Sequence, residues 1–92
     1  AEAAAAPGMV ALRQHVFAAL DDELARPRAH GADPRTEEAL RHLAGVLVHT
    51  PSVRARRLAA EGRSAAFVAA LAALYGIQVE PREIDLADDA TA

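Results

Sequence analysis

Large apolar residues recur every three or four positions over most of the chain, which is the spacing of amphipathic helices. Between Met9 and Arg26 this stripe consists of Met9, Leu12, Val16, Leu20 and Leu24, with Val10 and Phe17 beside it. Pro27 ends the predicted helix, and residues 28–32 form a short polar link. No stretch alternates apolar and polar residues as a half-buried strand does, so the pattern predicts an all-α fold.

A second helix is predicted to begin at Asp33 as N-cap, with Pro34 at its first position. Its large apolar residues are Leu40, Leu43 and Leu47, with Ala39, Val46 and Val48 alongside. From Leu43 to Val48 the helix is apolar on nearly every side. Such a segment lies either at the centre of the domain or under another chain.

The pair Thr50-Pro51 predicts a break, because proline lacks the amide that would continue the helix and suits the first turn of the next. A third helix is expected from Pro51 to Ala60, ending at Gly62. A fourth begins at Ser64 as N-cap and ends at Gly76, with Ile77 and Val79 folding back. The large apolar residues of this helix are Phe67, Val68, Leu71 and Leu74.

The chain has 92 residues, enough for one small domain with a modest core that a partner would help to cover. We expect a flexible segment over residues 1–8, a helical domain over 9–79, and an acidic, disordered tail over 80–92. The chain starts with alanine and lacks a secretory signal or a membrane-spanning stretch, which indicates a soluble, cytoplasmic segment of a longer protein.

The amino-acid composition excludes several kinds of catalytic and metal-binding site. There is no cysteine, so thiol nucleophiles and cysteine zinc sites are excluded. The four histidines lack the spacing of a helical metal site, and no catalytic constellation or phosphate-binding loop is present. The formal charge of −3 argues against general DNA binding. We therefore predict no catalytic, cofactor-binding or metal-binding residue.

Two polar features remain open to interpretation. His49, at the end of the second predicted helix, is expected to bond free carbonyl groups there, with a catalytic role as the alternative. The basic cluster of Arg54, Arg56, Arg57 and Arg63 is interpreted as a solvated face that pairs with neighbouring acids. Contact of Arg54, Arg56 and Arg57 with tRNA or an acidic partner is the alternative.

The segment Leu47-Val48-His49-Thr50-Pro51-Ser52-Val53-Arg54 resembles the Leu-His-x-Pro-Thr/Ser-Val-Arg segment of the C-terminal dimerisation domain of glutamyl-tRNA reductases. The resemblance extends from Met9 to Ile77 and includes Arg57-Leu58-Ala59-Ala60-Glu61-Gly62. Gly45-Val46 stands where family members usually carry lysine or arginine.

This resemblance implies a small bundle of about four helices, packed across a two-fold axis against a second subunit. The parent enzyme would reduce glutamyl-tRNA to glutamate-1-semialdehyde with NADPH, in tetrapyrrole and 5-aminolevulinate biosynthesis, whereas this segment would be non-catalytic and hold the homodimer together. His49, Thr50 and Pro51 would form the signature of the helix break. The residues expected at the dimer interface are Leu40, Leu43, Val46, Leu47, Val48, Phe67, Leu71 and Leu74.

Two other classes of function were weighed. A helix-turn-helix domain for DNA binding or protein docking would use the second and third helices, but the third is short and begins with proline. A small stand-alone enzyme is disfavoured because no reactive group of residues is present.

Overall fold

The computed structural model describes residues 2–26 and 33–79, which form four helical elements and no strand. A short 3-10 helix, η1 (Glu2–Ala5), leads directly into α1 (Ala6–Ala25). The longest helix is α2 (Pro34–Ala60), and a shorter helix, α3 (Ser64–Tyr75), follows it. The predicted all-α fold is confirmed, with three α-helices in place of about four.

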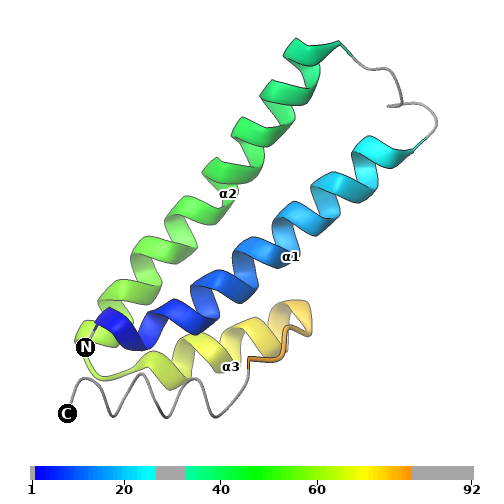
Figure 1. The fold of residues 1–92 in the computed structure, drawn as a ribbon. Coiled ribbons are helices and arrows are strands. Elements are labelled where there is room, and N and C mark those ends of the chain that lie inside the picture. Colours follow the sequence, from blue (N-terminus) through cyan, green and yellow to red (C-terminus); the bar gives the residue numbers. More distant parts are fainter. Residues whose placement is uncertain (1, 27–32, 80–92) are drawn as a thin grey trace.

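α1 and α2 form a long antiparallel hairpin, and α3 packs beside one end of it (Figure 1). The resulting shape is elongated, with extents of 49 × 20 × 20 Å. The other end of the hairpin, where α1 ends and α2 begins, contains these two helices without α3 (Figure 1). The molecule is therefore three helices thick at one end and two helices thick at the other.

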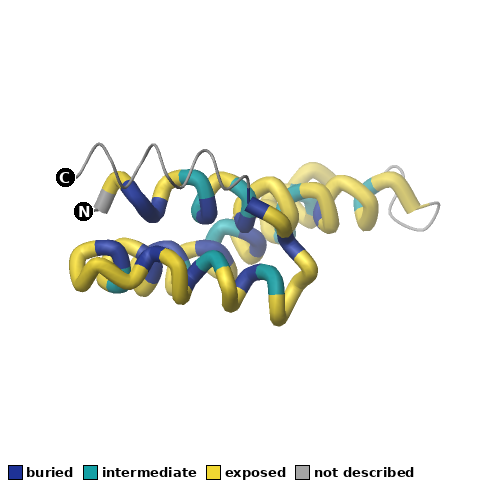
Figure 2. Tube along the Cα trace, turned by 90° about the horizontal axis from the view of Figure 1, so that it is seen from below, coloured by how far each residue is buried: buried dark blue, intermediate teal, exposed yellow. Residues whose placement is uncertain are grey.

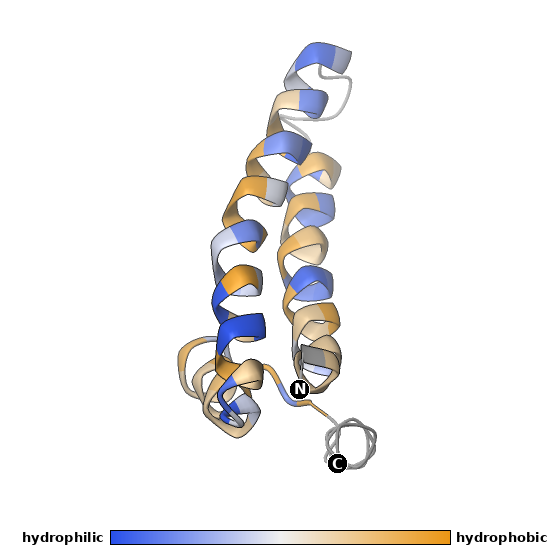
Figure 3. Ribbon diagram, turned by 90° about the vertical axis from the view of Figure 1, so that its left-hand side faces the viewer, coloured by the Kyte–Doolittle hydropathy of each residue, from blue (hydrophilic) through white to orange (hydrophobic). Residues whose placement is uncertain are grey.

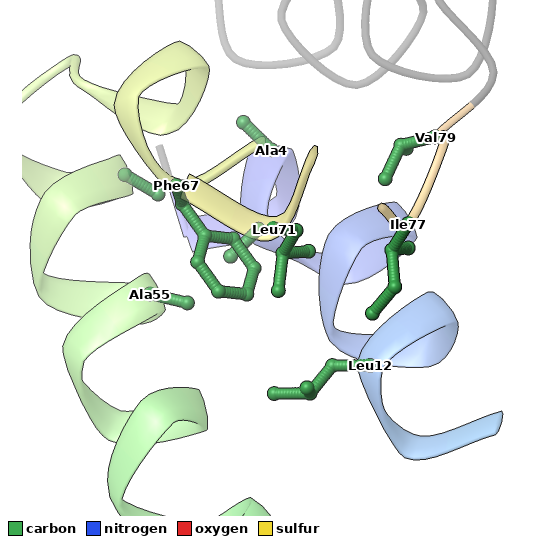
Figure 4. Close-up of a cluster of buried hydrophobic side chains, with 9 residues drawn as sticks. Ala4, Leu12, Ala55, Phe67, Leu71, Ile77 and Val79 are labelled. Atoms are coloured by element: carbon green, nitrogen blue, oxygen red, sulfur yellow. The ribbon is translucent and has the colours of Figure 1, made fainter. Parts of the chain in front are cut away.

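The core lies at the three-helix end, between α1, α2 and α3. The Phe67 ring extends from α3 towards Ala55 of α2, with Leu71 beside it and Leu12 of α1 opposite (Figure 4). Ile77 and Val79 fold back onto this cluster, as predicted. Burial is concentrated where the helices face one another, while the far end of the hairpin is mostly exposed (Figure 2).

Helix ends follow the signals in the sequence. The side chain of Asp33 accepts a hydrogen bond of 2.9 Å from the Arg35 amide, which confirms the predicted cap of α2. At its other end Gly62 takes a left-handed conformation, and the Arg63 amide donates to the Leu58 carbonyl at 2.7 Å. Gly76 ends α3 in the same left-handed region, again as predicted.

The predicted break at Pro51 is wrong, because α2 continues through this residue without interruption. On both sides of Pro51 the same face of the helix is buried, at Ala44, Val48, Ser52, Ala55 and Ala59. A bend would remove the last three of these residues from the core. The packing of this part of α2 against η1, α1 and α3 as a whole offsets the local cost of an interior proline, about 3 kcal/mol.

Other predictions about helix ends also differ from the structure. The turn required by a helix-turn-helix between the second and third predicted helices does not exist, since both belong to α2. His49 does not lie at a helix end, and Thr50 does not cap one. At the start of α3 the cap position is occupied by Arg63, with Ser64 as the first helical residue.

The N-terminal residues differ from the expected flexible segment. Residues 2–8 are helical, and Ala4 and Ala5 are buried against α2 in the core. Pro7 lies in the first turn of α1, a position that proline favours. The expected acidic tail over residues 80–92 lies outside the described residues.

Candidate functional site

Four large apolar side chains of α2 are exposed, Leu43, Val46, Leu47 and Val53, whereas Val48 is buried and Leu58 packs against the core. Leu43, Val46 and Leu47 have exposed fractions of 51%, 51% and 60%, whereas Ala55 on the opposite face is completely buried. The buried face of α2 consists mostly of small residues, which allows α1 and η1 to approach it closely. Half of the predicted apolar segment from Leu43 to Val48 is therefore exposed, at Leu43, Val46 and Leu47, whereas Ala44 and Val48 are buried.

Leu43 and Val46 belong to a continuous stripe along the outer side of α2, and Leu47 lies beside it. We call it the outer stripe; its members are Ala39, Leu43, Val46, Thr50 and Val53, all exposed. Their spacing alternates between four and three residues, which keeps them on one side of a helix over four turns. The outer side of α2 is orange in its middle and blue closer to its C-terminal end (Figure 3). Such a stripe is typical of a helix that packs against another helix.

A wide apolar groove runs beside the outer stripe, between α1 and α2. Its volume is ≈ 450 Å³. The groove is lined by Leu12, His15, Val16, Ala19, Leu20, Glu23, Leu40, Leu43, Ala44, Leu47 and Tyr75. The rings of Tyr75 and His15 contact each other with centroids 5.3 Å apart, which joins the end of α3 to α1 at this groove.

The end of α3 extends this apolar surface. Leu74 has an exposed fraction of 78%, and Tyr75 beside it is also exposed. Both residues line a second groove of ≈ 310 Å³ between α2 and α3, together with Thr50 and Pro51. We use the term apolar face for the surface formed by Leu43, Val46, Leu47, Leu74 and Tyr75. A contiguous set of exposed large apolar residues is typical of an interaction surface.

The structure divides the interface residues predicted from the sequence into two groups. Exposed or half-buried residues around the apolar face are Leu40, Leu43, Val46, Leu47 and Leu74. The others, Val48, Phe67 and Leu71, are buried inside this chain. Sequence spacing could not separate the groups, because Val48 follows Leu47 directly and differs from it only in the side of α2 that it occupies. Tyr75 was missed, since its position at the end of a helix gave no signal.

The arginine cluster lies towards the C-terminal end of α2. Arg54, Arg56 and Arg57 are exposed, and none of them forms an ion pair with a residue that the structure describes. The expected pairing with acids of neighbouring helices is therefore absent for these three residues within the described ranges. Arg63 does form a pair, with its guanidinium 3.6 Å from the Glu61 carboxylate.

His49 lies between two shallow depressions on α2. One has a volume of ≈ 380 Å³ and includes Arg13 and Arg56, and the other has ≈ 250 Å³ and includes Arg54 and Arg57. The first opens between α1 and α2, on the side away from the Leu40–Leu47 groove. No hydrogen bond or ion pair joins His49 to another side chain of residues 2–26 or 33–79.

The described residues contain no group of three histidines, cysteines or acids that could hold a metal ion. Within the same ranges no helix is long and apolar enough to cross a membrane.

Comparison with known proteins identifies relatives of this arrangement. A family model described as "Glutamyl-tRNAGlu reductase, dimerisation domain" matches residues 1–77. The glutamyl-tRNA reductase of Clavibacter michiganensis subsp. michiganensis is 54% identical over 81 residues, which cover 87% of this chain and 18% of the relative. That of Kocuria rhizophila is 49% identical over 75 residues, covering 77% of this chain and 17% of the relative.

A more distant relative is the glutamyl-tRNA reductase of Corynebacterium diphtheriae, 33% identical over 81 residues, or 82% of this chain and 18% of the relative. The chain thus spans less than a fifth of the length of these relatives. No solved structure matches it.

Proposed function

Because this chain belongs to the dimerisation-domain family of glutamyl-tRNA reductases, we propose that it holds two copies of its parent protein together. The contact is made by the apolar face on α2 and the end of α3. The fold carries this function without any catalytic group of its own.

The observation that carries the proposal is the placement of large and small residues on α2. Small side chains face α1 and η1, while Leu43, Val46 and Leu47 face outwards. A helix that served only a private core would place its large residues on the buried side. Burial of the exposed leucines and valine against a second copy would remove apolar surface from water, which favours association.

The activity of the parent follows from the family resemblance. We propose that the parent reduces glutamyl-tRNA to glutamate-1-semialdehyde with NADPH, in the formation of 5-aminolevulinate and tetrapyrroles. The thiolate that this resemblance assigns to the reaction is not supplied by this chain, which has no cysteine. The contribution of the chain is to set the distance and orientation between two enzyme copies.

Sedimentation equilibrium of the 92-residue chain tests the dimer directly, and Leu47→Asp tests the surface. The chain should be a dimer at micromolar concentration, and the variant should be a monomer, because a carboxylate cannot be buried unpaired in an apolar contact. Leu47 is exposed in the single chain, so the variant should keep its helix content.

Gln14→Asp is the matched control, since Gln14 is exposed on α1 and does not line either apolar groove. This variant should remain a dimer. A monomeric wild-type chain, or a Leu47→Asp variant that still dimerises with unchanged affinity, would contradict the proposal.

A further inference from the structure

Charged residues are segregated along the length of the molecule. Among the described residues, the two-helix end carries six acids and three arginines: Asp21, Asp22, Glu23, Asp33, Glu37 and Glu38, with Arg26, Arg35 and Arg41. The three-helix end carries the arginines of the cluster, of which Arg54, Arg56 and Arg57 have no ion-pair partner among the described residues. Two of the arginines at the two-helix end pair with acids there, Arg26 with Glu23 at 3.2 Å and Arg41 with Glu37 at 3.0 Å. Over residues 2–26 and 33–79, the net charge is therefore acidic at the two-helix end and basic at the three-helix end.

The outer stripe lies between these two ends. It extends from Ala39 to Val53, and Val46 is its midpoint. The groove between α1 and α2 continues from the stripe to Glu23 at the acidic end. In the other direction the groove between α2 and α3 includes Arg54. The apolar contact surface thus has an acidic border at one end and a basic border at the other.

We propose that two copies of this chain pack with their α2 helices antiparallel, about a two-fold axis that passes close to Val46. This inference rests on the proposed dimerisation and adds the orientation of the helices and the residues at the axis. In this arrangement Ala39 of one copy lies next to the partner's Val53, and Val46 lies next to the partner's Val46. Arg54 and Arg56 lie at the level of the partner's Glu38 along the helix axis, because residues whose numbers add up to 92 face each other in this register.

Charge decides between this arrangement and a parallel one. A two-fold axis along the helices would place each arginine of the cluster beside its own counterpart, and each acid beside the same acid. Like charges in contact oppose association, whereas complementary ends favour it and fix the register. The antiparallel arrangement also sets the two-helix end of each copy beside the three-helix end of the other, so the exposed end of α3 acquires a neighbour.

Disulfide mapping distinguishes the two arrangements, and the cysteine-free chain is suited to it. Single variants Val46→Cys, Ala39→Cys and Val53→Cys would be oxidised separately and in pairs. A disulfide needs Cα atoms within roughly 7 Å. In the antiparallel dimer the two copies of residue 39 are about 21 Å apart along the helix axis, at 1.5 Å per residue. Val46→Cys should therefore form a covalent dimer alone, while Ala39→Cys and Val53→Cys should do so only when mixed.

Gln14→Cys serves as the control for random collisions and should not form a covalent dimer. If the wild-type chain dimerises and two copies of the Ala39→Cys variant link to each other, the antiparallel arrangement is overturned, while the proposed dimerisation stands. Failure of Val46→Cys to link within a confirmed dimer would overturn α2 as the contact. A monomeric wild-type chain would overturn both proposals.

A charge exchange provides a second test. The double variant Arg54→Glu, Arg56→Glu should raise the dimer dissociation constant by about tenfold, since it places acids at the level of the partner's Glu38. Adding Glu38→Arg should restore the affinity. In a parallel dimer the first variant would remove no attractive pair and the second would bring no rescue, so the absence of rescue would overturn the inference.

Discussion

Gly8 allows α1 and α3 to approach each other closely. A Cβ atom at this position would lie 2.7 Å from the Cε2 atom of Phe67 and 3.5 Å from the Cδ1 atom of Leu71. Both neighbours are buried in the core, so neither can move away without disturbing other contacts. Gly45, in the middle of α2, has no atom within 4 Å of the same position.

Substitution of these two glycines by alanine should therefore have opposite effects on the free energy of unfolding. Gly8→Ala should lower the free energy of unfolding by about 1–3 kcal/mol, because the added methyl group overpacks the core. Gly45→Ala should raise it by about 0.5–1 kcal/mol, because alanine favours the helix and meets no neighbour. Urea titrations followed by circular dichroism would measure both changes. Equal effects of the two substitutions would show that the Phe67 ring gives way freely.

At the scale of the helices, most helix ends agree with the prediction from the sequence, whereas the predicted end before Pro51 does not exist. Asp33, Gly62 and Gly76 act locally, through a cap or a left-handed conformation, so their effect could be predicted from neighbouring residues. Pro51 locally favours a helix break. The burial of Ser52, Ala55 and Ala59 depends instead on α1 and η1, which are distant in sequence. Tertiary packing overrides the local preference there.

Because α2 is continuous through Pro51, replacing this residue by alanine is expected to stabilise the helix. Pro51→Ala should raise the free energy of unfolding by about 1–2 kcal/mol. The substitution restores an amide that can bond the Leu47 carbonyl, a gain of up to about 3 kcal/mol, and part of it is offset by the greater freedom of the unfolded chain. Thermal melts would measure the change, and sedimentation should show that association persists. A less stable variant would indicate that the proline ring makes contacts that alanine cannot replace.

For the whole molecule, the sequence indicated that a domain this small benefits from a partner, and the family resemblance supports the proposal that this partner is a second copy of the chain. The interaction surface could not be predicted from the sequence. Which side of α2 faces outwards depends on the burial of small residues on its other side, at Ala44, Ala55 and Ala59. Among the large side chains that the structure describes, Leu12 is the most completely buried, with an exposed fraction of 2%. We therefore expect the isolated chain to be marginally stable and its folding to be coupled to association.

This coupling predicts a melting temperature that depends on concentration. Dimerisation stabilises folded chains by mass action, and a tenfold rise in concentration is worth about 1.4 kcal/mol per dimer, or about 0.7 kcal/mol per chain. For a domain of this size the melting temperature should then rise by about 3–6 °C per tenfold increase. The Leu47→Asp monomer should melt at a lower temperature that does not change with concentration, because its unfolding involves one chain only. Melts from one to one hundred micromolar would show the difference, and a wild-type chain with a constant melting temperature would mean that each copy folds to full stability alone.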